Sequence, residues 1–253
     1  MERSNAKDKN FETPESDVFA PTETGSARDE TRSRIVVAAI DLLKSGGRDA
    51  VTTRAVAEAA GVQAPTLYRL FGDKNGLLDA VAQHGFASYL REKSVREAGA
   101  DPVEDLRAGW DLHVAFGLSN PAIYLLMYAD PRPGPKSPAA AASHLRLQQH
   151  IHRVARAGRL RLGEERAANL FHASGCGTVL TLLGIDEANR DMRLSEIARD
   201  AVIAAIATNS PTAEESSHAA AAISLRALLP DMTALSEAER GLLLEWLARL
   251  TER

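Results

Sequence analysis

The stretch from Val51 to Lys74, VTTRAVAEAAGVQAPTLYRLFGDK, constrains the fold more than any other part of the chain. Two short helices are predicted within it, because the Thr52 hydroxyl can cap the first helix and Gly61 can end it in the left-handed conformation. Pro65 suits the first turn of the second helix, where its missing N–H is not needed. Two helices joined by so tight a turn predict a helix-turn-helix.

The second of these helices has a predicted buried side and a predicted outward side. Leu67 and Phe71 have the spacing of a buried stripe, which leaves Thr66, Tyr68 and Arg69 facing outward. Arginine can pair with guanine or with phosphate, and Thr and Tyr can contact phosphate or a thymine methyl group. The pattern therefore indicates a DNA-recognition helix, with an ordinary helical hairpin and a solvated polar face as the alternative.

The run GVQAPTLYRLFGDKNGLLDAV, residues 61–81, resembles the DNA-binding domain of the tetracycline-repressor (TetR) family. The matching positions are Gly61-Val62, Thr66-Leu67-Tyr68, Phe71, Lys74 and Leu77-Leu78. With the preceding helix, the resemblance covers about Arg28 to Val81. It implies a homodimer that binds double-stranded DNA at a palindromic operator, with two recognition helices in successive major grooves about 34–36 Å apart.

The same resemblance implies which residues contact DNA. They lie at the start of the first short helix and along the second: Thr52, Thr53, Arg54, Gln63, Ala64, Pro65, Thr66, Tyr68, Arg69 and Lys74. Two of them depart from the pattern of the family. Gln63 stands where many members have a serine cap, and Ala64 lacks the polar reach that some relatives use to read a base. The operator sequence therefore does not follow from these residues.

Composition limits the class of protein around this motif. The net charge is −4, so any contact with nucleic acid must be local, and residues 28–74 hold eight Lys or Arg against six Asp or Glu. The single Cys176 excludes a disulfide within the chain and a cysteine-based metal cluster. We find no apolar run of membrane-spanning length and no signal peptide, and we expect a cytoplasmic protein with no membrane partner.

The periodicity of the whole chain predicts an all-α fold in three parts. Residues 1–27 are expected to be a disordered arm, residues 28–75 the helix-turn-helix domain, and residues 76–253 a larger helical domain for ligand binding and dimerisation. The expected helices outside the motif span about 28–45, 73–97, 102–119, 122–129, 139–157, 164–183, 194–207, 223–229 and 236–250. A proline-rich loop is expected at 130–138 and a polar linker at 208–217.

Six side chains in the larger domain suggest a ligand site: Trp110, His113, Phe116, Tyr124, Met127 and Tyr128. Aromatic rings with polar groups beside a methionine suit an apolar cavity, and a solid core is the alternative. The resemblance favours a cavity, because TetR-family proteins commonly bind small molecules in this domain. We therefore expect one cavity that takes a small, mostly apolar effector.

Metal, cofactor and catalytic sites are not indicated. No two of the five histidines at positions 113, 144, 150, 152 and 172 are four residues apart, and Cys176 is expected to lie far from them. The common nucleophile, zinc-protease and nucleotide-binding motifs are absent. Gly175 and Gly177 predict close helix packing, and the resemblance implies that residues 164–183 and 194–207 form the dimer interface.

The resulting prediction is a dimeric transcriptional regulator. We expect a repressor that a small ligand releases from its DNA operator. Two alternatives from other classes remain at this point. One is a helical enzyme or ligand-binding protein with a non-functional helix-turn-helix, and the other is a helical scaffold protein. Binding to the DNA that flanks the protein's own gene would separate the regulator from both.

Overall fold

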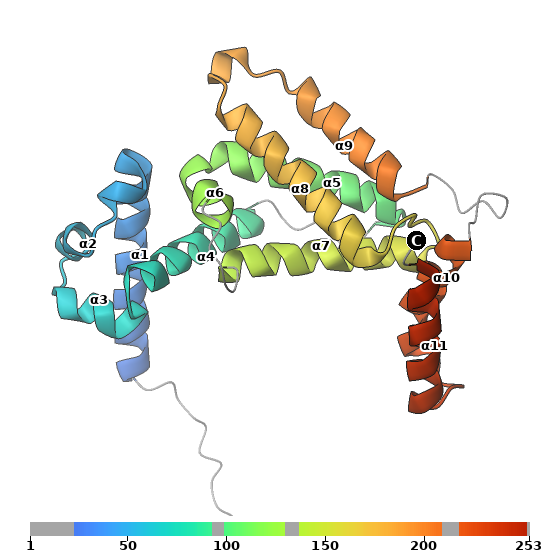
Figure 1. The fold of residues 1–253 in the computed structure, drawn as a ribbon. Coiled ribbons are helices and arrows are strands. Elements are labelled where there is room, and N and C mark those ends of the chain that lie inside the picture. Colours follow the sequence, from blue (N-terminus) through green and yellow to red (C-terminus); the bar gives the residue numbers. More distant parts are fainter. Residues whose placement is uncertain (1–22, 93–98, 130–136, 209–217, 252–253) are drawn as a thin grey trace, which may run out of the picture.

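The computed structural model describes residues 23–92, 99–129, 137–208 and 218–251, and these residues form an all-α fold. They contain eleven α-helices and no β-strand, apart from an isolated bridge between Leu160 and Ala207. Figure 1 shows α1, α2 and α3 at one end of the molecule and α10 and α11 at the other. Helices α4 to α9 lie between these ends. The all-α prediction is confirmed.

The first four helices are α1 (Glu23–Ala50), α2 (Thr53–Ala59), α3 (Ala64–Phe71) and α4 (Lys74–Glu92). Helix α1 begins five residues before its predicted start, so the end of the predicted arm is helical. Residues 27–30 are exposed. An exposed helical turn needs no apolar residues, so apolar spacing in the sequence could not predict this start. The rest of the arm and the predicted end of α4 lie outside the described residues. Gly47 interrupts α1 with a φ of 67°, close to the predicted stop.

The remaining helices form the larger part of the molecule. They are α5 (Pro102–Ser119), α6 (Pro121–Tyr128), α7 (Pro138–Arg156), α8 (Glu164–Leu183), α9 (Arg193–Ile206), α10 (His218–Leu228) and α11 (Glu237–Thr251). Two short 3₁₀ helices, η1 (Glu187–Asn189) and η2 (Leu229–Asp231), follow α8 and α10. The predicted loop at 130–138 and the linker at 208–217 fall almost wholly outside the described residues.

Side chains cap the N-termini of several helices. Asp73 accepts a bond from Gly76 N at 2.8 Å, and Asp101 accepts one from Val103 N at 2.8 Å. Ser236 and Glu239 bond each other's backbone N–H groups, which completes a capping box. The sequence Asn120-Pro121 suggests a similar cap for α6, but the Asn120 side chain forms no such bond. Its Nδ2 instead donates to the carbonyl of Phe116 at the end of α5, at 3.3 Å.

A buried apolar stripe holds the N-terminal helices together. Val36, Ala39 and Leu43 of α1 are buried at helical spacing, and they join Leu67 of α3 and Leu78 of α4 in one core. Ile40 is only half-buried, because the buried side of α1 is centred closer to Ile35. At about 25 cal/mol per Å² of apolar surface, this shared burial stabilises α2 and α3, which are too short to be stable alone.

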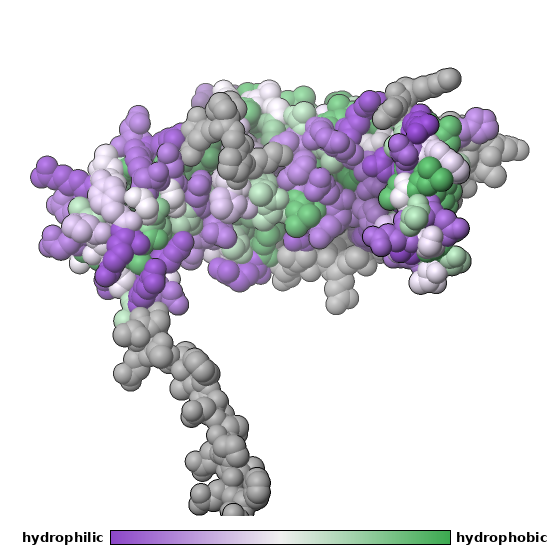
Figure 2. All heavy atoms as spheres, turned by 60° about the horizontal axis from the view of Figure 1, so that its bottom comes forward, coloured by the Kyte–Doolittle hydropathy of each residue, from purple (hydrophilic) through white to green (hydrophobic). Residues whose placement is uncertain are grey.

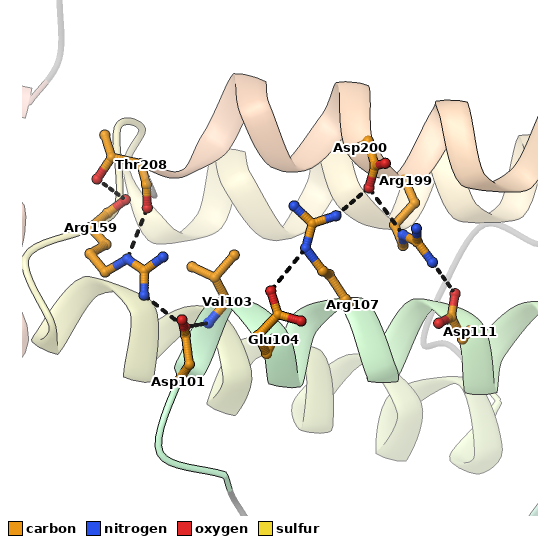
Figure 3. A network of polar contacts seen from close by, with 9 residues as sticks. All are labelled: Asp101, Val103, Glu104, Arg107, Asp111, Arg159, Arg199, Asp200 and Thr208. Atoms are coloured by element: carbon orange, nitrogen blue, oxygen red, sulfur yellow. Dashed lines mark hydrogen bonds and ion pairs between the residues drawn. The ribbon is translucent and has the colours of Figure 1, made fainter. Parts of the chain in front are cut away.

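A row of charged side chains joins α9 and the connection between α7 and α8 to α5 (Figure 3). Arg159 is largely buried and contacts Asp101 at 2.7 Å and the carbonyl of Thr208 at 2.8 Å. The Val103 N–H and the Arg159 guanidinium hold the pKa of Asp101 below its usual value. Along the same row, Arg107 pairs with Asp200, and Arg199 pairs with Asp111 at 2.8 Å. These contacts fix α9 against the outer side of α5.

The surface differs between the two ends of the molecule. On the face drawn in Figure 2, hydrophilic residues cover much of the end formed by α1 to α3, and a green apolar patch lies at the end formed by α10 and α11. Exposed apolar side chains on α11 are Leu242, Leu244, Trp246 and Leu250. None of the helices in the described part of the chain has both the length and the hydropathy to cross a membrane.

Candidate DNA-binding and ligand-binding sites

The turn between α2 and α3 has the geometry that its sequence predicts. Thr52 Oγ1 accepts a bond from Ala55 N at 3.1 Å, which caps α2. Gly61 has a φ of 63°, a conformation that costs glycine little, and Val62 N donates to the carbonyl of Ala57 at 2.9 Å. The chain therefore leaves α2 and enters α3 within four residues, and Pro65 lies in the first turn of α3.

Helix α3 has the two sides that its pattern predicts. Leu67 is 2% exposed, whereas its neighbour Tyr68 is 53% exposed and Arg69 is also exposed. All the predicted DNA contacts are accessible, either exposed (Thr52, Arg54, Gln63, Ala64, Pro65, Tyr68, Arg69) or half-buried (Thr53, Thr66, Lys74). Their contact with DNA stays a prediction, and their accessibility is what it requires.

The charges and dipoles around α3 favour an anion. Gln63 is the N-cap of α3, and its side chain forms no capping bond. Pro65 has no N–H and the Thr66 N–H donates to the Gln63 carbonyl at 2.9 Å, so the Ala64 N–H is the first-turn donor that stays open to another acceptor. At the other end of α3, Arg69 shares a shallow surface hollow with Arg28 and Thr31 of α1. The closeness of Arg28 to Arg69 could not be predicted from the sequence, because it depends on how α1 packs on α3.

The larger part of the molecule contains a cavity of about 80 Å³ between α4, α5, α7 and α8. That volume is several times the roughly 10–15 Å³ that one buried water needs. Of the six side chains predicted to line one cavity, Trp110, His113 and Phe116 do so. The other three, Tyr124, Met127 and Tyr128, lie on α6 and are absent from the wall. Ligand binding by any of the six stays a prediction.

The two tyrosines of α6 contact His113 and do not line the cavity themselves. The Tyr124 hydroxyl and His113 Nε2 share a hydrogen bond of 2.9 Å, and the Tyr128 ring lies 5.8 Å from the His113 ring. Burial, with a contribution from His172, lowers the pKa of His113 to about 4. Burial also raises the pKa of Tyr124, and it raises that of Tyr128 to about 12. All three groups are therefore neutral near pH 7, which suits a mostly apolar wall.

Most of the cavity wall was not identified from the sequence. Helix α4 contributes Phe86 and Tyr89, and α8 contributes Phe171, His172 and Gly175. Helix α7 contributes a stripe at i, i+3, i+4 and i+7: Ser143, Arg146, Leu147 and His150. This spacing was the available signal, since it marks one face of a helix. Three residues in the stripe are polar, as on a helix face that is exposed to solvent. Hydropathy alone therefore does not predict that the stripe lines a cavity.

Two glycines of α8 that predict close packing have different surroundings. A methyl group at Gly175 would lie 3.4 Å from His113 Cδ2 and 3.6 Å from Trp110 Cζ3, so this glycine lets α8 approach α5 within one chain. Gly177 has no side chain or neighbouring backbone within 4 Å of such a group. The expectation that Cys176 lies far from the histidines is wrong, because its Sγ is 3.7 Å from His172, one helical turn away.

Helix α6 joins the cavity to the N-terminal helices. It packs against α1 and α4 on one side and against α5 on the other. A methyl group at Gly85 of α4 would lie 2.3 Å from Ile123 Cδ1, so a side chain there would require Ile123 of α6 to shift. The hydrogen bond between Tyr124 and His113 therefore links the cavity wall to the helix that packs against α1 and α4.

Comparison with known proteins finds sequence similarity in the N-terminal region. Residues 35–81 match the sequence model described as bacterial regulatory proteins, tetR family. The chain is 51% identical over 49 residues to the tetracycline repressor protein class A from transposon 1721 of Escherichia coli, which is 19% of this chain and 23% of that protein. It is 41% identical over 92 residues to the HTH-type transcriptional repressor KstR of Mycobacterium tuberculosis, which is 35% of this chain and 41% of that protein.

The larger part of the chain is compared through its fold. The structure of RolR in complex with resorcinol superposes with a TM-score of 0.57 at 21% identity, covering 79% of this chain and 95% of that one. At that identity the likeness shows a shared fold. The chain spans less than half the length of the curated relatives that it matches. The likeness to the tetR family of bacterial regulatory proteins therefore lies in residues 35–81, and the likeness to RolR over most of the chain is one of fold.

Proposed function

We propose that the chain is a dimeric DNA-binding transcriptional regulator, a repressor that a small ligand releases from a palindromic operator in the cytoplasm. The contrast between buried Leu67 and exposed Tyr68 on a helix entered through a capped turn carries the proposal. That contrast lies inside the segment that matches the family model. In this proposal the chain has no catalytic residues, cofactor or metal, and α3 enters the major groove.

The cavity supports the ligand half of the proposal. Its apolar wall and few polar groups have the character of a small-molecule site. RolR, which shares the fold, was solved with resorcinol bound. A ligand can release DNA only if it binds the DNA-incompetent arrangement of the dimer more tightly than the competent one. In our proposal, α6 transmits the ligand's effect, since it contacts the cavity wall through Tyr124 and packs against α1 and α4.

Exposed apolar side chains on α8 and α9 support a dimer. Leu170 and Leu180 of α8 and Leu194 and Ile197 of α9 are all exposed in the single chain, which is unusual for so many large apolar residues on one helix pair. Val179 and Leu182 of α8 are fully buried within the chain and do not belong to this exposed set. The proposed partner surface is therefore formed by the outward sides of α8 and α9.

A gel shift with the DNA that flanks the protein's own gene tests the proposal. Tyr68→Ala is expected to weaken binding by about 1–3 kcal/mol, roughly 10- to 100-fold, and to leave the melting temperature unchanged. Trp246→Ala on α11 is a matched control, because Trp246 is 52% exposed and Tyr68 is 53% exposed. The control is expected to bind DNA like the parent protein.

Two results would contradict this function. If the parent protein binds flanking DNA no better than random DNA of the same length, the helix-turn-helix is not functional at that site. If Tyr68→Ala and Trp246→Ala weaken binding equally, the loss has no connection with α3. Either result would favour a helical ligand-binding protein or scaffold over a regulator.

A further inference from the structure

We infer that the cavity takes an aromatic carboxylate, with the carboxylate held by Arg146 and His150 and the ring held by the aromatic wall opposite. This assignment rests on the proposed function only in treating the cavity as the effector site. It goes beyond a mostly apolar ligand by giving the effector a charge and a shape. The argument begins with α7, which supplies the polar end of the cavity.

Arg146 brings a positive charge to the cavity wall without a matching negative charge. Within the residues that the structure describes, no carboxylate pairs with Arg146. Asp105, which influences the same side of α7, is already bonded to Arg153 and to Gly99 N at 3.0 Å. An arginine at a partly enclosed site favours an anion, and its planar fork matches the two oxygens of a carboxylate.

His150 supplies a second group on the same face, one helical turn after Arg146. Its Nδ1 is buried and has no hydrogen-bond partner within the described residues. A buried polar atom left in this way is uncommon and costs free energy, so it is expected to be satisfied when the site is filled. Burial and the nearby charge of Arg146 lower the pKa of His150, while Asp105 opposes the shift. The imidazole is therefore neutral near pH 7 and can donate one hydrogen bond to an anion.

The rest of the wall favours an aromatic ring over an alkyl chain. Three of the six Phe residues, one of the two Trp and one of the four Tyr line this cavity. Trp110 and Phe171 meet edge to face with centroids 5.3 Å apart, as do Phe86 and Phe116 at the same separation. Rings in this arrangement present edges and faces that a flat aromatic ligand can extend. The Trp110 Nε1 donates to Ser195 at 3.0 Å, so the indole N–H is already satisfied.

Fluorescence of Trp110 can report binding directly. The chain has two tryptophans, so Trp246→Phe leaves Trp110 as the single reporter, and Trp246 is exposed on α11, away from the cavity wall. The probes are benzoate and 3-phenylpropanoate, their uncharged amides, and hexanoate. We expect an aromatic carboxylate to change Trp110 fluorescence and raise the melting temperature, with at least about tenfold weaker binding of its amide and of hexanoate.

Substitutions of Arg146 then identify the carboxylate site. Arg146→Met is expected to weaken binding of the carboxylate about 10- to 100-fold and to leave amide binding unchanged, because it removes the charge but keeps the length of the side chain. Arg146→Lys should lose less. Arg166→Met on α8 is the matched control, since Arg166 is exposed and outside the cavity. His150→Phe should also weaken the carboxylate. Circular dichroism of each variant shows whether it is folded, and Arg146→Gln replaces Arg146→Met if the latter is not.

Several results would overturn the assignment. Equal binding of benzoate and benzamide, or an unchanged affinity in Arg146→Met, would remove the anion from the proposal. Equal binding of hexanoate would remove the aromatic ring. Absence of binding by every probe would remove the ligand class altogether.

The operator assay separates this assignment from the proposed function. If an aromatic carboxylate binds the cavity but does not release DNA, the ligand class stands and ligand-controlled release fails. If only a neutral compound releases DNA, the regulator stands and the carboxylate assignment fails.

Discussion

The DNA-binding surface and the ligand cavity are assembled in different ways. The proposed DNA contacts lie between Thr52 and Lys74, where a capped turn and one buried leucine orient α3. The cavity wall comes from four helices and spans Phe86 to Gly175. A site built on consecutive residues can be altered on its outer side without loss of core. A site built between helices has walls that are also the core, so its function and its stability are linked.

The largest expected effect tests that link at Trp110. This side chain lines the cavity, is fully buried, and bonds Ser195 of α9. Trp110→Ala is expected to lower the free energy of unfolding by about 3–5 kcal/mol, because it removes a large buried ring and leaves the Ser195 hydroxyl without this partner. Urea denaturation followed by circular dichroism measures the change. Trp246→Ala, which removes an exposed ring, should change stability by less than about 0.5 kcal/mol. Similar losses in both would mean that the cavity wall is not core.

A second effect of the cavity wall appears in acid. The pKa of His113 is lowered to about 4 in the folded protein, mainly by burial, and is about 6.5 in the unfolded chain. The unfolded state therefore binds a proton first as the pH falls, so the stability that His113 contributes is complete above pH 6.5 and is lost towards pH 4. The full loss is about 3 kcal/mol. Stability measured by urea denaturation between pH 7 and pH 4 should fall less steeply in His113→Phe. Parallel curves for parent and variant would show that His113 is not the group responsible.

The same contrast explains what the sequence could predict. Thr52, Gly61, Pro65 and Leu67 act within a few residues of one another, so capping, left-handed glycine and helical spacing predict their geometry before any tertiary contact is known. The order and type of the later helices follow from periodicity for the same reason. The roles of Tyr124 and Tyr128 could not be predicted, because a stripe on α6 does not reveal whether it faces the cavity or supports His113.

Some site residues could not be predicted because of their polarity, and others because they are far apart in the sequence. Arg146 and His150 have the spacing of one helix face, but charged and polar side chains normally face solvent. The sequence therefore does not predict that this face lines a cavity. Arg28 and Arg69 lie more than forty residues apart in the chain, and only the packing of α1 on α3 places them at one hollow. Local rules are reliable where the site is local, and tertiary packing decides the rest.

A smaller effect distinguishes contact within the chain from contact between chains. A side chain at Gly175 meets His113 and Trp110, whereas one at Gly177 meets nothing within 4 Å in the same chain. Gly177→Leu is therefore expected to leave the single chain folded and to weaken the proposed dimer by about 1–3 kcal/mol through overpacking. Sedimentation at several concentrations measures the shift towards monomer. Gly175→Leu should instead lower the melting temperature and disturb ligand binding. An unchanged dimer in Gly177→Leu would place the interface elsewhere, with α11 as the next surface to test.

The smallest effects compare the two caps within the helix-turn-helix. Thr52 caps α2 through a bond of 3.1 Å, whereas Gln63 at the same position of α3 forms no capping bond. Thr52→Ala is expected to cost about 1 kcal/mol of stability, because a first-turn N–H loses its acceptor. Gln63→Ser should raise stability by up to about 1 kcal/mol, since a short hydroxyl can accept from the Thr66 N–H, which donates to the Gln63 carbonyl in the parent protein. Thermal denaturation measures both changes. If the first turn of α3 holds a DNA phosphate, Gln63→Ser should also weaken operator binding while it stabilises the fold, because the new hydroxyl competes with the phosphate for the Thr66 N–H. A variant that is stabilised and binds DNA as tightly as the parent would show that the phosphate is held by side chains such as Tyr68 and Arg69 instead.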